Sequence, residues 1–401
     1  MAGSFFTPKA IIVDSNSFFI GTTFYNTTTI PSNENKITAS DGAAGDSFGF
    51  SVAVGCGRII VGASGDGDNG TSSGSAYIFD LDGNQLTKIT ASDGAAIDNF
   101  GISVAVGSGR IVVGAYLDNF YQGSAYIFDL DGNELTKITA SDGAASDFFG
   151  WSVAVGCGRI VVGAYGDDDN GSISGSAYIF DLDGNQLAKI TASDGAAEDY
   201  FGYKVAVGSG RIVVGATDDD DNGSASGSAY IFDLDGNQLT KITASDGAAG
   251  DYFGQLLAIG CGRIVVSSFY DDIGSNSNQG SAYIFDLDGN QLAKITASDG
   301  AADDYFGTSV SVGSGRIVVG TDRDDDNGSA SGSAYIFDLD GNQLDKITAS
   351  DGAASDFFGT SVAIGSGRIV VGAPGDNSGQ GSAYIYNTPY QVHYLDQLDK
   401  R

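Results

Sequence analysis

A Phe-Gly pair recurs seven times along this chain of 401 residues, and successive copies stand 49 to 53 residues apart. The seven phenylalanines are Phe48, Phe100, Phe149, Phe201, Phe253, Phe306 and Phe358. A unit of this length holds about four short strands, and it is too small to bury both faces of its sheet alone. The copies must therefore pack side by side and share their cores.

Each copy has the same order of strand patterns. In the first copy, residues 51–54 alternate polar and apolar side chains, as a half-buried strand does. Residues 59–61 are continuously apolar, which is typical of a central strand covered on both faces. Residues 75–79 alternate large aromatic and smaller side chains, and residues 85–91 follow an Asp-Gly hairpin signal. The pattern predicts an all-β fold, a seven-bladed β-propeller of four-stranded blades.

The last copy ends after its third strand, and the strand that it lacks stands alone near the start of the chain. The Lys-Ile-Thr-Ala-Ser segment at residues 36–40 precedes the first Phe-Gly with no strands of its own blade before it. We expect residues 36–40 to pair with residues 382–386 and close the ring. This organisation predicts an N-terminal extension at 1–35, a propeller at 36–387 and a C-terminal tail at 388–401.

The charge and the N-terminal segment limit the partners. A formal net charge of -32 excludes binding to nucleic acid or anionic lipid through a basic face. The N-terminus shows no Sec signal, and no apolar run is long enough to insert in a membrane. Residues 11–13 and 18–20 are apolar, so we expect the extension to dock on a partner or on the propeller's own flank.

The motif order within a copy resembles a known family. Phe-Gly is followed by Val-Gly-Ala, with Pro374 completing Val-Gly-Ala-Pro in the last copy, and then by Gly-Ser-Ala-Tyr-Ile-Phe. This order is similar to the FG-GAP repeat of integrin α-subunit propellers and of bacterial and phage proteins, over about seven eighths of the chain. The resemblance implies a seven-bladed propeller in non-enzymatic adhesion or ligand binding. Integrin-type calcium loops lie between the first and second strands, where this chain has only Gly-Cys-Gly-Arg or Gly-Ser-Gly-Arg, so those sites do not carry over.

Acidic residues gather instead in the loop between the second and third strands. One aspartate recurs there in every copy, and four copies add a second in the pattern Asp-x-Asp-Asn-Gly. Alternate oxygen ligands followed by glycine suit Ca²⁺, and turn propensity alone is the competing explanation. The predicted calcium ligands are Asp66, Asp68, Asp167, Asp169, Asp219, Asp221, Asp324 and Asp326.

Three other repeated features have structural interpretations. The aspartate two residues before each phenylalanine, Asp46 in the first copy, is expected to accept backbone hydrogen bonds or to pair with a lysine or arginine. Asp80 belongs to a hairpin turn. The three cysteines stand where other copies have serine, so they are interpreted as free thiols in tight turns: Cys56, Cys157 and Cys261.

The copies differ most in the loop between the second and third strands. Copies two and five carry aromatic residues there, and exposed loop aromatics favour binding. The predicted ligand-binding residues are Tyr116, Phe120, Tyr121, Phe269 and Tyr270. The residue after each Phe-Gly also varies, which we interpret as packing drift within a strand: Phe50, Ile102, Trp151, Tyr203, Gln255, Thr308 and Thr360.

Catalysis has little support, because the only histidine, His393, lies outside the repeats and no Ser-His-acid arrangement can be assembled. We expect a non-enzymatic binding, adhesion or structural module on a virion or cell surface, with the cytoplasm as the alternative location. Its partners are a protein or glycan receptor, or other structural subunits reached through the N-terminal segment. Two alternatives are a polysaccharide-active hydrolase using channel carboxylates and a purely structural virion decoration protein.

Overall fold

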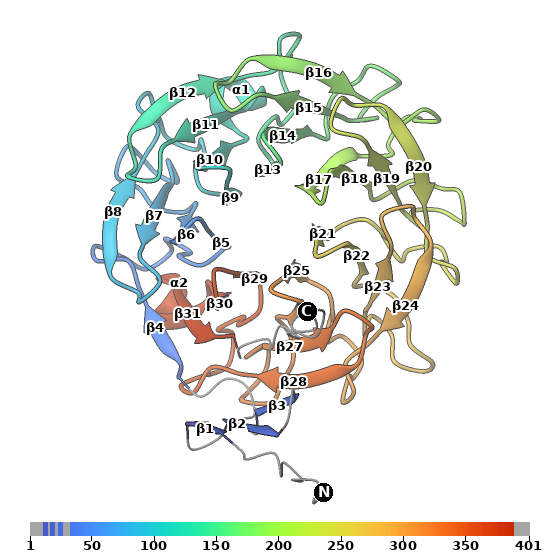
Figure 1. The fold of residues 1–401 in the computed structure, drawn as a ribbon. Helices are drawn as coiled ribbons and strands as arrows, with labels where there is room; N and C mark the ends of the chain where they lie inside the picture. The colour runs from blue at the N-terminus through green and yellow to red at the C-terminus, as the bar shows by residue number, and fades with distance from the viewer. Residues whose placement is uncertain (1–10, 15–16, 21–22, 27–32, 389–401) are drawn as a thin grey trace, which may run out of the picture.

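The computed structural model describes residues 11–14, 17–20, 23–26 and 33–388. Its main body is a ring of seven four-stranded antiparallel sheets (Figure 1). The predicted all-β, seven-bladed propeller is therefore confirmed. No helix of the described segments is long and apolar enough to cross a membrane.

The four strands of each blade lie side by side from the centre of the ring to its rim, in chain order in every blade but the last (Figure 1). The innermost strands are β5 (Ser51–Gly55), β9 (Val104–Gly107), β13 (Ser152–Gly156), β17 (Phe201–Gly208), β21 (Leu257–Gly260), β25 (Ser309–Gly313) and β29 (Ser361–Gly365). The second strands are β6 (Arg58–Ala63), β10 (Arg110–Ala115), β14 (Arg159–Ala164), β18 (Arg211–Ala216), β22 (Arg263–Ser268), β26 (Arg316–Thr321) and β30 (Arg368–Ala373).

The outer half of each blade contains the aromatic strand and the rim strand. The third strands are β7 (Ser75–Phe79), β11 (Ser124–Phe128), β15 (Ser176–Phe180), β19 (Ser228–Phe232), β23 (Ser281–Phe285), β27 (Ser333–Asp338) and β31 (Ser382–Asn387). The outermost strands are β8 (Gln85–Ile89), β12 (Glu134–Ile138), β16 (Gln186–Ile190), β20 (Gln238–Ile242), β24 (Gln291–Ile295), β28 (Gln343–Ile347) and β4 (Asn35–Ile37). Two single turns, α1 (Asp118–Tyr121) and α2 (Asp376–Gly379), lie in the loops of blades two and seven.

The N-terminal strand completes blade seven. β4 pairs antiparallel with β31, and Lys36 stands opposite Tyr384. Figure 1 shows the blue β4 beside the red β31. The Glu34 carboxylate extends this contact by accepting a hydrogen bond from the Tyr386 hydroxyl at 2.9 Å. The predicted ring closure is confirmed, although the paired strand covers residues 35–37 instead of 36–40.

A separate three-stranded antiparallel sheet precedes the ring. It consists of β1 (Ile11–Asp14), β2 (Ser17–Ile20) and β3 (Thr23–Asn26). The predicted docking of residues 11–13 and 18–20 stays a prediction, because the side chains of these residues are not among those that the structure describes. Most of the predicted tail, with His393, also lies outside the described residues.

The Phe-Gly phenylalanines form the core between adjacent blades. Phe48 is fully buried, and its ring meets Tyr77 and Phe79 edge-on at 5.4 and 5.9 Å. The same pair of edge-on contacts recurs in the other six blades. Gly49 has φ +93°, and a Cβ there would lie 2.3 Å from the Ser382 carbonyl oxygen. Only glycine lets the chain pass so close to the neighbouring blade.

A serine at the start of the inner strand ties most blades to the next. The Ser51 hydroxyl donates to the Gly101 carbonyl at 2.7 Å. Equivalent serines bond to the following blade through a carbonyl or a backbone N–H: Ser103, Ser152, Ser309 and Ser361. Blades four and five have Lys204 and Leu256 at this position, so their side chains make no such tie.

Candidate functional site

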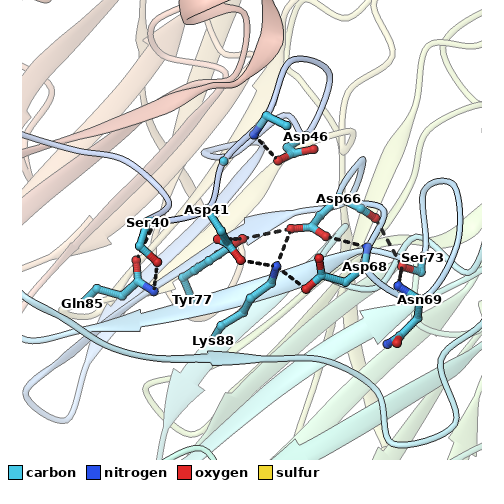
Figure 2. Close-up of polar contacts among 12 residues, drawn as sticks. Ser40, Asp41, Asp46, Asp66, Asp68, Asn69, Ser73, Tyr77, Gln85 and Lys88 are labelled. Atoms are coloured by element: carbon cyan, nitrogen blue, oxygen red, sulfur yellow. Dashed lines mark hydrogen bonds and ion pairs between the residues drawn. The ribbon is translucent and has the colours of Figure 1, made fainter.

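A lysine from the outermost strand lies among the predicted calcium ligands. In blade one, Lys88 Nζ lies 2.8 Å from an Asp66 carboxylate oxygen and 2.6 Å from one of Asp68. It also lies 2.8 Å from Asp41, in the linker that enters the blade (Figure 2). The Tyr77 hydroxyl donates to Asp66 and Asp41, both at 2.9 Å. The ammonium of Lys88 therefore pairs with three carboxylates, and the hydroxyl of Tyr77 hydrogen-bonds to two of them.

The other predicted ligand pairs are brought together in the same way. Their lysine partners follow the same order along the chain: Asp167 and Asp169 with Lys189, Asp219 and Asp221 with Lys241, and Asp324 and Asp326 with Lys346. In two blades, three carboxylate oxygens lie within 4.8 Å of one another and could hold a metal ion: Asp142, Asp167 and Asp169, and Asp194, Asp219 and Asp221. We call each lysine with its carboxylates and tyrosine a lysine cluster.

The electrostatics of a lysine cluster favour the ammonium. Burial alone would lower the pKa of Lys88, but hydrogen bonds to Asp41, Asp66 and Asp68 outweigh it and hold this pKa above its usual value. Burial would raise the pKa of Asp41, and the bonds from Lys88 and Tyr77 lower it instead. The cluster is therefore a set of mutually stabilised charges. The sequence signal for it was one lysine per copy, which stands opposite the tyrosine in the strand register.

The other repeated aspartates have the structural roles that the sequence indicated. A carboxylate oxygen of Asp46 accepts a hydrogen bond from the Ala43 N–H at 2.6 Å, and burial raises the pKa of Asp46. Asp80 accepts from the backbone N–H groups of Asp82 and Asn84 and so holds the hairpin turn. The three cysteines are free and exposed, as expected.

The seven residues that follow Phe-Gly all line one hollow at the centre of the ring, with a volume of about 460 Å³. Each comes from a different blade: Phe50, Ile102, Trp151, Tyr203, Gln255, Thr308 and Thr360. Our placement of this position within a strand is wrong for six blades, and the packing drift that we inferred from that placement stays a hypothesis. In six blades the residue stands before the inner strand, and only Tyr203 lies within one. The position varies where side chains face the hollow, which we call the central hollow.

The wall of the central hollow is not symmetric. Blades one to four contribute apolar or aromatic side chains at this level of the ring, whereas blades five to seven contribute an amide and two hydroxyls. Trp151 is the centre of the aromatic part. Its ring lies 4.9 Å from Tyr116, 5.4 Å from Tyr165 and 5.5 Å from Tyr203. At this level the wall is amphipathic, with apolar and aromatic side chains from blades one to four and hydrogen-bonding groups from blades five to seven.

The predicted ligand-binding residues of blade two form a strip that leads to this wall. Tyr116 touches Trp151 directly, and Tyr121, which is 47% exposed, lies 6.2 Å from Phe148. Phe120 is 84% exposed at the tip of the loop and has positive φ. These three residues therefore lie on one loop, with Tyr116 innermost.

The predicted residues of blade five line the central hollow themselves. Phe269 and Tyr270 have ring centroids 4.5 Å apart, and both belong to the lining. Tyr305 of blade six joins them at 5.4 Å from Tyr270. The aromatic loop of blade five therefore lines the hollow, whereas the loop of blade two meets its wall through the contact of Tyr116 with Trp151. Their part in binding stays a prediction.

Three charged residues of the lining escaped the sequence reasoning. Lys204, Asp322 and Arg323 depart from the repeat, which was the available signal. A side-chain oxygen of Gln255 and one of Asp322 are buried and have no hydrogen-bond partner in the described protein. Burial raises the pKa of Asp322 to about 6. The Arg323 guanidinium lies 5.0 Å from the centre of the Tyr305 ring.

Seven sheets with a repeated frame and one non-repeating hollow define a seven-bladed β-propeller repeat protein. The chain belongs to the FG-GAP repeat family, whose model matches residues 31–79, 84–128, 133–180, 185–232, 237–285, 290–337 and 342–386. Propellers of this family are commonly binding or structural modules and are generally non-enzymatic, and their repeats often bind calcium. A comparison with curated proteins gave no match.

Proposed function

We propose that the chain is a recognition module that binds a glycan in the central hollow. The observation that supports this proposal is the placement of the variation. Seven copies with nearly the same frame contribute six different residue types to the hollow at one position, and only copies six and seven share theirs, a threonine. The frame does not need these differences, because every blade packs its Phe-Gly core in the same way. A single asymmetric ligand would require them.

The chemistry of the wall suits a sugar. A sugar ring has C–H faces that pack on aromatic side chains and hydroxyls around its edge that need hydrogen-bond partners. Trp151 and Tyr203 offer the first surface, and Gln255, Thr308 and Thr360 offer the second. A volume of about 460 Å³ falls within the range of small-ligand pockets.

The aromatic strip of blades two to four suits a ligand longer than one ring. Phe148 lies 6.2 Å from Tyr121, stacks on Tyr165 at 5.0 Å, and Tyr165 in turn lies 5.4 Å from Trp151. An oligosaccharide that ends in the hollow would continue outward over this strip, and its outer units would reach the loop of Phe120.

The hydrolase alternative needs two carboxylates at the sugar. Among the described residues that line the hollow, Asp322 is the one carboxylate. The discriminating measurement is the release of reducing ends from glycans that bind. A structural decoration protein would bind none of them.

Calcium at the loop aspartates is a separate proposal. The carboxylates are close enough for a metal ion in blades three and four, but Lys189 and Lys241 lie among them. A bound Ca²⁺ would have to displace the ammonium from its ion pairs. Display on a virion or cell surface, with attachment through the N-terminal segment, is also part of the proposal and is tested by the identity of neighbouring genes.

The single tryptophan of the chain makes the main test direct. Because Trp151 lines the hollow, its fluorescence reports on ligands there. We expect a glycan array to give hits, and each hit to change this fluorescence on titration. Trp151→Thr, which installs the residue of copies six and seven, should weaken calorimetric binding at least about tenfold, or about 1.4 kcal/mol. Leu86→Ser, on the exposed outer strand, is the matched control. An array without hits, with and without Ca²⁺, would end the proposal.

A further inference from the structure

Lys204 differs from every other described lysine. The seven lysines of the outermost strands are all ion-paired: Lys36, Lys88, Lys137, Lys189, Lys241, Lys294 and Lys346. The side-chain ammonium of Lys204 has no ion pair and no hydrogen bond with any residue that the structure describes. It is half-buried, and it lines the central hollow. Five other copies have a serine here that ties two blades together, so a lysine gives up that tie.

The charge of the hollow opposes the charge of the molecule. Of the described lining residues, Lys204 and Arg323 are positive and Asp322 is negative, which leaves a formal charge of +1 in a chain of -32. Arg323 also has no ion pair within the described chain. Burial lowers the pKa of Lys204, because the channel wall replaces water without supplying a carboxylate. A bound anion would supply that missing partner.

Two acceptor oxygens in the hollow lack a hydrogen-bond donor among the described residues. One side-chain oxygen of Gln255 and one of Asp322 are buried without a hydrogen bond in the described protein. Sugar hydroxyls donate to such oxygens, and a buried acceptor without a donor destabilises the hollow when no ligand is bound. The hollow thus combines a cation, two acceptors and an aromatic surface around Trp151.

We propose that the glycan of the central hollow is acidic, and that Lys204 binds the carboxylate of a uronic or nonulosonic acid unit. This inference rests on the proposed glycan-binding function. In this arrangement the ring of the acidic unit packs on Trp151 and Tyr203, its hydroxyls donate to Gln255 and Asp322, and its carboxylate pairs with the ammonium of Lys204.

The experiment compares ligands that differ only in the acid. Trigalacturonate and sialyllactose are each compared with their fully methyl-esterified forms, and all four ligands are titrated into the full chain by calorimetry. We expect at least one acid to bind at least tenfold more tightly than its neutral partner, and about 0.5 M salt to reduce this preference. Lys204→Ser should bring the ratio of the two affinities close to one, and Lys204→Arg should keep most of it. Arg211→Ser, which removes a positive charge outside the hollow, should leave the ratio unchanged.

The outcomes distinguish a failure of the acidic-ligand inference from a failure of the proposed glycan binding. If the neutral ligands bind as tightly as the acids, the acidic ligand is wrong and glycan binding stands. If Lys204→Ser keeps the preference for the acids, Lys204 does not bind the carboxylate and this inference is wrong, while glycan binding stands. If no ligand of either kind binds and the glycan array is empty, both proposals fail. Because Lys204→Ser installs the residue of five other copies, it should fold, and an unchanged melting temperature verifies this.

Discussion

The lysine clusters at the rim and the central hollow are built from the same seven repeats under opposite requirements. In a cluster the lysine, tyrosine and two of the aspartates recur in every blade, because each cluster is complete within one blade and its incoming linker. The hollow takes one residue from each blade at a given level, so equal residues would give a symmetric wall. The comparison teaches that repetition marks the residues that hold the ring, and departure from repetition marks the residues that line the central hollow.

The largest expected effect tests the ring itself. Deleting residues 1–40 removes β4, Lys36 and the buried Ile37 and Ala39, and leaves the edge of β31 unpaired. We expect a loss of about 4 kcal/mol or more in the free energy of unfolding, or a chain that does not fold. Thermal unfolding followed by circular dichroism measures it. Deleting residues 1–32 keeps β4 and is the control; equal melting temperatures for the two deletions would contradict the closure.

The second prediction tests whether a lysine organises a cluster. Lys189→Met leaves the buried Asp167 without its ammonium, and we expect a loss of about 3 kcal/mol. Arg159→Met is the control, because its ion pair with the exposed Asp235 should contribute about 1 kcal/mol or less. Added Ca²⁺ should recover part of the loss in Lys189→Met and should stabilise the wild type less, because there it has to displace the ammonium of Lys189. A similar Ca²⁺ stabilisation of both proteins would show that the metal, not the lysine, organises the cluster.

The third prediction separates stability from binding at the hollow. Tyr203→Thr replaces a half-buried ring with the residue of copies six and seven, and we expect a change of less than about 1 kcal/mol in stability. Binding of any ligand that alters Trp151 fluorescence should weaken at least about tenfold. Denaturant titration and calorimetry measure the two effects. A large loss of stability with unchanged binding would show that the position after Phe-Gly serves packing and not ligand binding.

The fourth prediction concerns pH. Burial raises the folded pKa of Asp304 from its ordinary value of 3.8 to about 6, although the Ala301 N–H hydrogen bond lowers it. The folded state therefore holds the proton of the Asp304 carboxyl more tightly than the unfolded state does. This difference stabilises the fold in full below about pH 4, and the stabilisation is lost as the pH rises through about 6. Asp304→Asn should remove about 2 kcal/mol of this dependence between about pH 4 and 7. Urea denaturation across this pH range measures the unfolding free energy, and Asp288→Asn, at an exposed position, is the control. If the two variants show the same change of unfolding free energy with pH, burial of Asp304 does not cause the dependence.

The smallest expected effect lies at the loop tip of blade two. Phe120 is 84% exposed and has φ +59°, a conformation that asparagine tolerates better than phenylalanine. Phe120→Asn should raise the unfolding free energy by up to about 0.5 kcal/mol. Weaker binding of long oligosaccharides, with unchanged binding of short ones, would place Phe120 at the outer end of the aromatic strip. Equal binding of both would remove it from the predicted ligand residues.

The amino-acid sequence by itself determined the blade, the blade count and the closing strand. The Phe-Gly period, the alternation in residues 51–54 and the orphan strand at 36–40 are local patterns, and local backbone and burial preferences were enough to interpret them. The pairing of Tyr77 with Lys88 was not visible, because it depends on the register of two strands.

Only the tertiary structure decided what faces the centre. Trp151, Tyr203 and Gln255 stand 52 residues apart in the chain, and ring closure brings them to one wall. Before that, the position after Phe-Gly had the appearance of a strand residue with relaxed packing. The direction of a side chain relative to the axis of the ring is a property of all seven blades together, which is why no single copy could reveal it.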